Sequence, residues 1–145
     1  MTLASLYNTI GGVFWQWGNL TEASDYVRRS LDLYQELSYA WGTANAYSNL
    51  GVLSHLQGGW SQASDHFQHA LALRRENGYL PEEADSLNNL GQLHLMMGEH
   101  ERARKELMSS LGISRRLGND RGIAHAQETL ARLAVAESRF DEAAA

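Results

Sequence analysis

The chain has 145 residues, of which 43% are hydrophobic and 20% are charged, as in an ordinary globular protein. Its formal net charge of −5 argues against nucleic-acid binding, which normally needs a basic face. Because the chain has no cysteine, disulfides and thiolate-bound metals are excluded. Residues 1–8 lack the basic and apolar regions of a signal peptide, and no apolar run approaches the ~20 residues of a membrane span. We therefore expect a soluble cytoplasmic protein that binds neither nucleic acid nor membranes.

The sequence repeats itself every 40 residues. When the chain is shifted by this period, residues of the same class align along its whole length. The clearest columns are Gly11, Gly51, Gly91 and Ala131; Gly18, Gly58, Gly98 and Ser138; and Ala23, Ala63, Ala103 and Ala143. A fixed period of this length predicts repeated copies of one supersecondary unit.

The apolar residues within each repeat have helical spacing. In the second repeat, Tyr47, Leu50 and Ser54 fall on one helical face. Gly58 ends that helix, because glycine readily takes the left-handed conformation after a helix, and Pro81 opens a later helix. The predicted helices cover residues 3–17, 21–37, 42–57, 61–77, 81–97, 101–117 and 120–137, and a further short helix begins at Asp141. No strand is predicted.

The motifs of the repeats resemble those of the tetratricopeptide repeat (TPR) family. That family has Trp-x₂-Leu-Gly-x₂-Tyr followed by Ala-x₃-Phe. The chain has Tyr47-x₂-Leu50-Gly51-x₂-Ser54 followed by Ala63-x₃-Phe67, and Leu87-x₂-Leu90-Gly91-x₂-His94 followed by Ala103-x₃-Leu107. The period of 40 is longer than the usual 34 and indicates longer helices. It is similar to the repeats of polarity scaffolds and kinesin light chains, and to those of bacterial multidomain regulators; the residues from Arg115 to Ala124 look most like the bacterial group.

This resemblance implies an all-α fold, a right-handed superhelical stack of antiparallel helix hairpins (a TPR solenoid) with about three and a half repeats. We expect one domain over residues 1–145, with repeats at approximately 4–43, 44–83 and 84–123 and a partial repeat at 124–145. Within each hairpin, we expect Gly11, Gly51 and Gly91 to make room for the partner helix. The first helix of each hairpin would line a concave groove.

The groove face of these first helices is rich in amides. An asparagine can pair with both the N–H and the C=O of an extended peptide, so the row predicts a ladder that reads a peptide backbone. Equally, the same amides could stabilise the packing between hairpins, and the sequence leaves both interpretations open. The predicted groove residues are Asn8, Trp15, Asn45, Asn49, His55, Asp85, Asn88, Asn89, Gln92, Leu95, His125, Glu128 and Arg132.

The sequence gives little support to a carboxylate clamp, a metal site or a catalytic site. No Lys or Arg precedes Arg121 on a predicted groove helix, so we do not expect the carboxylate clamp of the chaperone-binding relatives. His66 and His69 have the spacing of two metal ligands, but zinc needs three or four. The acidic run at residues 82–85 is explained by the positive end of a helix dipole. We predict no catalytic residue, no cofactor and no metal, and therefore a protein that is not an enzyme.

Two functions remain open. The first is a protein–protein interaction scaffold that holds an extended peptide or partner segment in the groove. The second is a structural or regulatory segment of a larger signalling or transcription-regulator chain, whose groove is filled intramolecularly. At the C-terminal edge, Ala131, Ala134 and Phe140 predict an open apolar face, covered either by further repeats or by self-association. Alternatively, helix 120–137 is polar enough to cap the stack itself.

Overall fold

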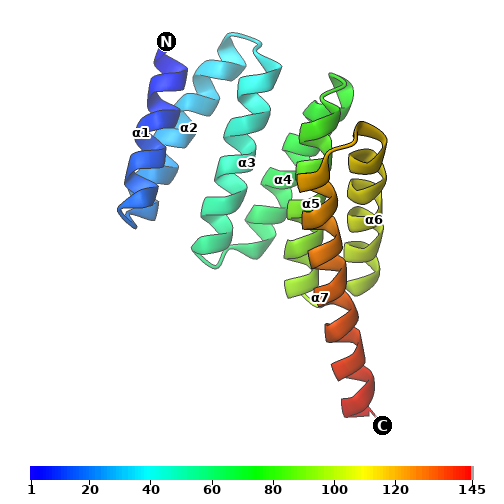
Figure 1. The fold of residues 1–145 in the computed structure, drawn as a ribbon. Coiled ribbons are helices and arrows are strands. Elements are labelled where there is room, and N and C mark those ends of the chain that lie inside the picture. The colour runs from blue at the N-terminus through cyan, green and yellow to red at the C-terminus, as the bar shows by residue number, and fades with distance from the viewer. Residues whose placement is uncertain (145) are drawn as a thin grey trace. The chain divides into compact units, whose positions relative to one another are not determined.

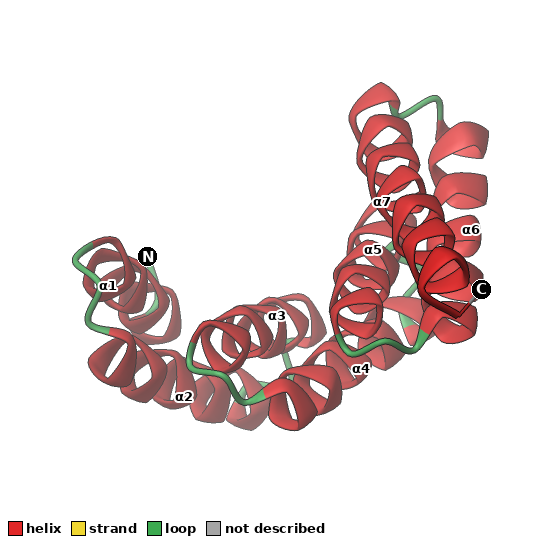
Figure 2. Cartoon of the chain, turned by 90° about the horizontal axis from the view of Figure 1, so that it is seen from below, coloured by secondary structure: helices red, strands yellow, loops and turns green. Residues whose placement is uncertain are grey.

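The computed structural model describes residues 1–144, which form seven α-helices and no strand (Figure 1). The helices are α1 (Leu3–Gln16), α2 (Leu20–Glu36), α3 (Ala40–Leu56), α4 (Trp60–Glu76), α5 (Leu80–Met96), α6 (His100–Leu117) and α7 (Asp120–Ala144). Short turns join them into hairpins (Figure 2). The predicted all-α fold is confirmed. None of the helices described combines the length and apolar character required to cross a membrane.

The chain divides into two compact units. Unit 1 spans Met1–Gly78 and contains the hairpins α1–α2 and α3–α4. Unit 2 begins at Tyr79 and contains the hairpin α5–α6 together with α7. The expectation of one domain over the whole chain stays a prediction.

The two helices of each hairpin meet at a glycine on one side and an alanine on the other. The alanines are Ala23, Ala63 and Ala103, each 0% exposed. A Cβ atom on Gly51 would lie 2.6 Å from the ring of Phe67, and one on Gly91 would lie 2.5 Å from Leu107. Real carbon atoms do not approach so closely, so any side chain at these positions would force its neighbours to shift. The helix contact expected at these columns is therefore present.

In two of the hairpins, a buried serine of the second helix forms a hydrogen bond to the first helix. The Ser30 hydroxyl of α2 donates to the carbonyl oxygen of Ala4 in α1 at 2.8 Å, and the Ser110 hydroxyl of α6 donates to that of Ala84 in α5 at 2.8 Å. The bonds satisfy hydroxyl groups that are almost fully buried. The 40-residue repeat thus extends to the hydrogen bonds inside the hairpins.

The turns between helices depend on a left-handed residue. Glycine takes this conformation in five turns: Gly18, Gly58, Gly78, Gly98 and Gly118. In the turn between α2 and α3, however, Ser38 adopts a φ of 52°. This conformation crowds the Cβ atom of an L-residue, so the turn at Ser38 is strained.

We expect Ser38→Gly to raise the free energy of unfolding by up to about 1 kcal/mol, because glycine removes the left-handed strain. The matched control is Ser109→Gly, which places glycine on an exposed position of α6 and costs roughly 0.5–1 kcal/mol. Urea unfolding of the two variants should therefore give changes of opposite sign. A loss of stability in Ser38→Gly would show that the turn is not strained.

The predicted break before Asp141 is wrong. Helix α7 continues without interruption from Asp120 to Ala144. The reason lies at Ser138, which replaces the glycine found at Gly18, Gly58 and Gly98. Without a glycine to turn the chain, the alanine-rich segment extends the helix.

Candidate functional site

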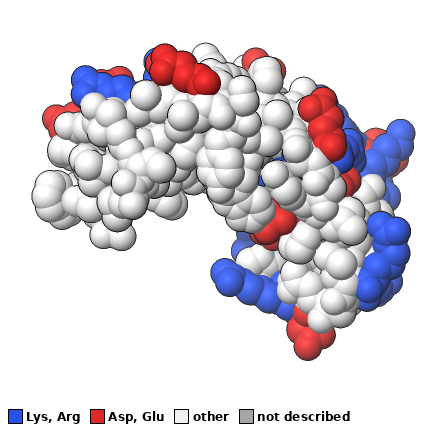
Figure 3. Space-filling model, turned by 90° about the horizontal axis from the view of Figure 1, so that it is seen from above, with Lys and Arg blue, Asp and Glu red and all other residues white. Residues whose placement is uncertain are grey.

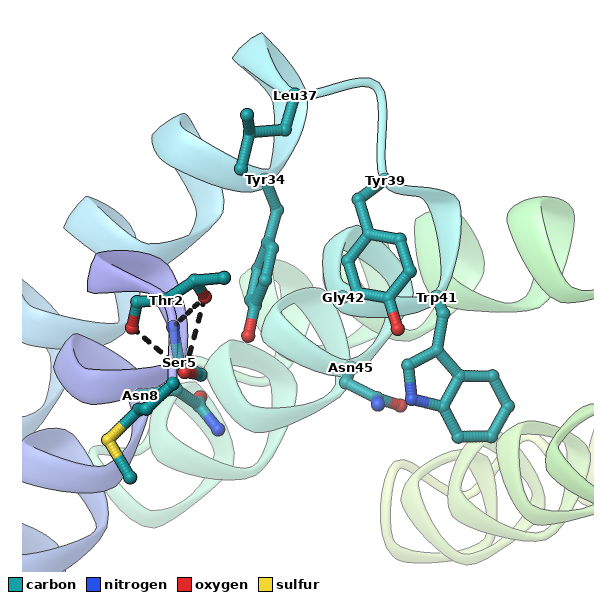
Figure 4. A pocket seen from close by; sticks show the side chains of 10 residues that line it. Thr2, Ser5, Asn8, Tyr34, Leu37, Tyr39, Trp41, Gly42 and Asn45 are labelled. Atoms are coloured by element: carbon teal, nitrogen blue, oxygen red, sulfur yellow. Dashed lines mark hydrogen bonds between the residues drawn. The ribbon is translucent and has the colours of Figure 1, made fainter.

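Two pockets lie along the first helices of unit 1. The larger, of about 660 Å³, is formed by the start of α1, the end of α2 and the start of α3 (Figure 4). The smaller, of about 250 Å³, lies further along α1 and α3. Asn8 lines both pockets, so they form one surface, which we call the α1–α3 groove. Its principal residues are Ser5, Asn8 and Trp15 of α1; Tyr34 of α2; Tyr39 in the turn; and Trp41, Asn45 and Asn49 of α3.

A hydrogen bond between two asparagines bridges this groove. The Asn49 Nδ2 atom of α3 donates to the Asn8 Oδ1 atom of α1 at 2.9 Å. Both side chains are half-buried. The bond leaves the Asn8 amide nitrogen and the Asn49 amide oxygen without a partner among the described residues. The bridge therefore joins two hairpins and still offers one donor and one acceptor.

Asn45, the third predicted amide in unit 1, is hydrogen-bonded to a residue of α4. Its Oδ1 atom accepts a hydrogen bond of 3.0 Å from an Nη atom of Arg74 in α4. Arg74 is only 6% exposed, so its guanidinium group is buried behind Asn45. Asn45 lines the larger pocket with its position fixed by this bond.

Aromatic rings form one wall of the larger pocket. Figure 4 shows Tyr34 and Tyr39 next to each other, with Trp41 further along, beyond Asn45. The rings of Tyr34 and Tyr39 have centroids 5.6 Å apart at an angle of 57°. The Tyr34 ring lies directly on Gly42, where a Cβ atom would come within 2.5 Å of it. The sequence analysis missed these aromatics, although they flank the predicted helix break near residue 38 and could have been found there.

Two further residues predicted for the groove also lie in unit 1. Trp15 is 47% exposed and lines the smaller pocket. His55 is half-buried and lines neither pocket.

The remaining predicted groove residues lie in unit 2. Asp85, Gln92, His125, Glu128 and Arg132 are exposed, whereas Asn89 and Leu95 are half-buried. On α7, Arg132 and Glu128 form an exposed ion pair of 2.7 Å.

The asparagine bridge has no counterpart in unit 2. Asn88 and Thr129 occupy the positions of Asn8 and Asn49 there, but the Thr129 hydroxyl donates to the carbonyl oxygen of His125 at 3.1 Å. Asn88 is 6% exposed, and its Oδ1 atom is buried without a hydrogen-bond partner among residues 1–144. Its side chain is not accessible to a ligand.

The histidine pair of α4 is packed against an aromatic ring. His69 stacks on Tyr47 of α3 with ring centroids 4.9 Å apart, and its Nδ1 atom lies 2.8 Å from the carbonyl oxygen of Asp65. Burial, with the nearby Arg28 and His69, lowers the pKa of His66. Within residues 1–144, no three His, Asp or Glu side chains are grouped to hold a metal ion.

A buried His–Glu pair joins α5 to α6, and the sequence analysis missed it. His94 is 0% exposed, and its Nδ1 atom lies 2.6 Å from Glu106 Oε2. Burial raises the pKa of the Glu106 carboxyl, while the bond to His94 and the charges of His94 and Arg102 act in the opposite direction. The corresponding residues of the first hairpin are Phe14 and Tyr26, whose rings stack 5.4 Å apart. Aligning these columns would have found the pair and its packing role.

The comparisons with known proteins agree with this architecture. A Tetratricopeptide repeat family model matches residues 2–76, 42–114 and 82–145, which together cover almost the whole chain. The chain belongs to the tetratricopeptide repeat family. No curated protein matches this TPR chain in sequence.

Solved structures share the TPR fold at low sequence identity. Apo RapI is 18% identical with a TM-score of 0.87, and the match covers 97% of this chain and 51% of RapI. Aspartyl phosphate phosphatase F from Bacillus subtilis is 15% identical with a TM-score of 0.82, covering 97% of this chain and 40% of the phosphatase. The first TPR of Spaghetti (RPAP3), bound to the HSP90 peptide SRMEEVD, is 16% identical with a TM-score of 0.74, and the match covers 94% of both chains. The chain thus spans about half the length of RapI.

Proposed function

We propose that this TPR protein is a protein-interaction scaffold whose α1–α3 groove holds an extended segment of a partner. The observation that carries the proposal is the Asn8–Asn49 bridge, which presents an unused amide donor and an unused amide acceptor between two pockets. An extended peptide offers the complementary pair, a C=O and an N–H, on its backbone. The two pockets would receive side chains on either side of the bridge.

The role is binding without catalysis, in the cytoplasm. TPR proteins generally act as scaffolds, and a TPR structure of similar fold contains a bound HSP90 peptide. The binding energy would come mainly from aromatic or aliphatic anchors buried in the pockets, with the amide bridge setting the register of the backbone.

A second arrangement has support from the lengths of similar proteins. The chain matches 51% of RapI and 40% of aspartyl phosphate phosphatase F, so chains with this fold also occur within longer proteins. In that arrangement the groove is filled by another part of the same parent chain. Groove peptides would then bind the TPR segment alone but not the full parent protein, which separates the two cases.

The test of the main proposal is selection from a displayed library of random octapeptides. We expect the protein to enrich peptides whose affinity falls about tenfold in Asn8→Ala with Asn49→Ala, since each lost hydrogen bond is worth about 0.5–1.5 kcal/mol. The control is Asn77→Ala, which removes an exposed amide that bonds only to the carbonyl of Leu73. Failure to enrich any peptide, or equal binding by the bridge variant, would reject the proposal.

Self-association through the C-terminal edge is a separate proposal. On α7, Val135 is 53% exposed and Phe140 is 69% exposed, and Phe140 borders a pocket with Glu99, His100 and Arg102 of unit 2. We expect a second copy of the chain to cover this apolar surface at high concentration.

Light scattering tests the association directly. Val135→Glu with Phe140→Glu should give a monomer at concentrations where the wild type is a dimer. The control is Met108→Glu, which adds a charge at a side chain of α6 that is 52% exposed. A wild type that stays monomeric would contradict the proposal.

A further inference from the structure

We infer that the segment recognised by the α1–α3 groove is uncharged and inserts an aromatic or large aliphatic side chain among Tyr34, Tyr39 and Trp41. The inference rests on the proposed function and names the chemistry of the partner. It concerns only unit 1, where the bridge and both pockets lie.

The two first helices of unit 1 carry no carboxylate, ammonium or guanidinium group, and the single histidine of α3, His55, lines neither pocket. Neither α1 (Leu3–Gln16) nor α3 (Ala40–Leu56) contains Asp, Glu, Lys or Arg. The Lys and Arg residues of unit 1 are Arg28 and Arg29 of α2 and Arg74 and Arg75 of α4. Figure 3 shows the end of the molecule that holds α1 as largely white, with charged groups at its margin.

A charged partner side chain would therefore lose hydration in the groove without gaining a counter-charge. Removing a charge from water without a partner costs far more than removing an apolar group. Arg74 does not supply the missing charge, because it is 6% exposed and its guanidinium group donates to Asn45.

The larger pocket is shaped for an apolar side chain. Tyr34 is 9% exposed and cannot move towards α3, because its ring already lies on Gly42. Tyr39 is 50% exposed, and the half-buried Trp41 also lines the pocket. An entering ring can pack edge-on or offset against these aromatics, the arrangements that aromatic pairs prefer.

Charge also decides against two other kinds of partner. An acidic tail such as the peptide SRMEEVD, which the RPAP3 structure holds, needs cations that α1 and α3 lack. A basic side chain would likewise find no carboxylate on α1 or α3. Both remain as outcomes of the experiment.

The experiment sequences the octapeptides that the intact protein enriches from two random libraries. One library displays internal peptides without a free carboxylate, and the other displays free C-termini. We expect the enriched peptides to be depleted in Asp, Glu, Lys and Arg, to contain Phe, Tyr, Trp or Leu, and to show no preference for the free carboxylate. Enrichment of acidic, basic or carboxylate-dependent peptides through the same groove would overturn this inference while leaving the scaffold proposal intact.

Substitutions in the larger pocket test whether the selected peptides bind there. For a synthetic peptide recovered by selection, we expect about tenfold weaker binding in Tyr39→Ala and in Trp41→Ala, as for an aromatic hot spot. Trp60→Ala, at a tryptophan of α4 that is 39% exposed and lines neither pocket, should leave the affinity unchanged. Affinity should change by less than about twofold between low and high salt, because no ion pair contributes. Full binding by both pocket variants, or a steep loss of affinity with salt, would contradict the assignment.

Discussion

Gly51→Leu should lower the free energy of unfolding by about 3 kcal/mol, near the upper end of the usual range for overpacking. The first added carbon alone would lie 2.6 Å from two ring atoms of Phe67, and Gly51 belongs to the fully packed interface between α3 and α4. Phe67 is 3% exposed, so its ring lies within the core. Chemical denaturation measures the change, and an unchanged stability would remove the packing reason for the glycine column.

Alanine substitutions at two helical glycines provide the control for this prediction. Gly112 of α6 is an exposed helical glycine, and a Cβ atom added to it would have no neighbouring atom within 4 Å. Gly112→Ala should therefore raise stability by about 1 kcal/mol through helix propensity alone. Gly51→Ala should lower stability, and Phe67→Leu in the same chain should recover part of the loss. The same substitution then has opposite signs at two helical glycines, as the contacts require.

Glu106→Ala should lower the free energy of unfolding by about 1–3 kcal/mol, because it removes the carboxylate that pairs with the fully buried His94. The control is Glu101→Ala, whose side chain is 84% exposed and pairs with Arg104 at the surface. That change should stay within about 1 kcal/mol. Equal effects of the two substitutions would show that the buried pair contributes no more than a surface pair.

The same carboxyl predicts a pH dependence. Burial raises the pKa of Glu106 above its ordinary value of 4.5. A raised pKa in the folded state means that the stability contributed by this group is fully present below the unfolded value and is lost as the pH rises through the folded value. The stability of the wild type relative to Glu106→Gln should therefore fall as the pH rises above about 4.5. A difference that stays constant or grows with pH would contradict this assignment.

The sequence predicts most of the fold because periodic glycines both end the helices and admit their partners. All seven helices occur within two residues of the predicted starts, and only the end of α7 differs greatly. That error arose at Ser138, where the repeat provides no glycine. The opposite occurs at Ser38. There the chain turns without a glycine, because a serine adopts the left-handed conformation that glycine takes in the other turns.

The candidate site was predicted less completely. The 40-residue register places Asn8, Asn45, Asn49 and Trp15 correctly on the first helices, but it does not determine which amides bond to one another. Asn88 shares the register of Asn8 and is nevertheless buried. The aromatic wall was missed because Tyr34 and Tyr39 come from a second helix and a turn, outside the helices considered for the groove.

Amide chemical-shift mapping with a selected octapeptide tests the central proposal most directly. The binding site in the α1–α3 groove predicts the largest shifts at Ser5, Asn8, Trp41, Asn45 and Asn49, and their loss in the Asn8→Ala, Asn49→Ala variant. Shifts confined to the outer faces of α2 and α4, with the groove residues unchanged, would show that the partner binds elsewhere on the protein.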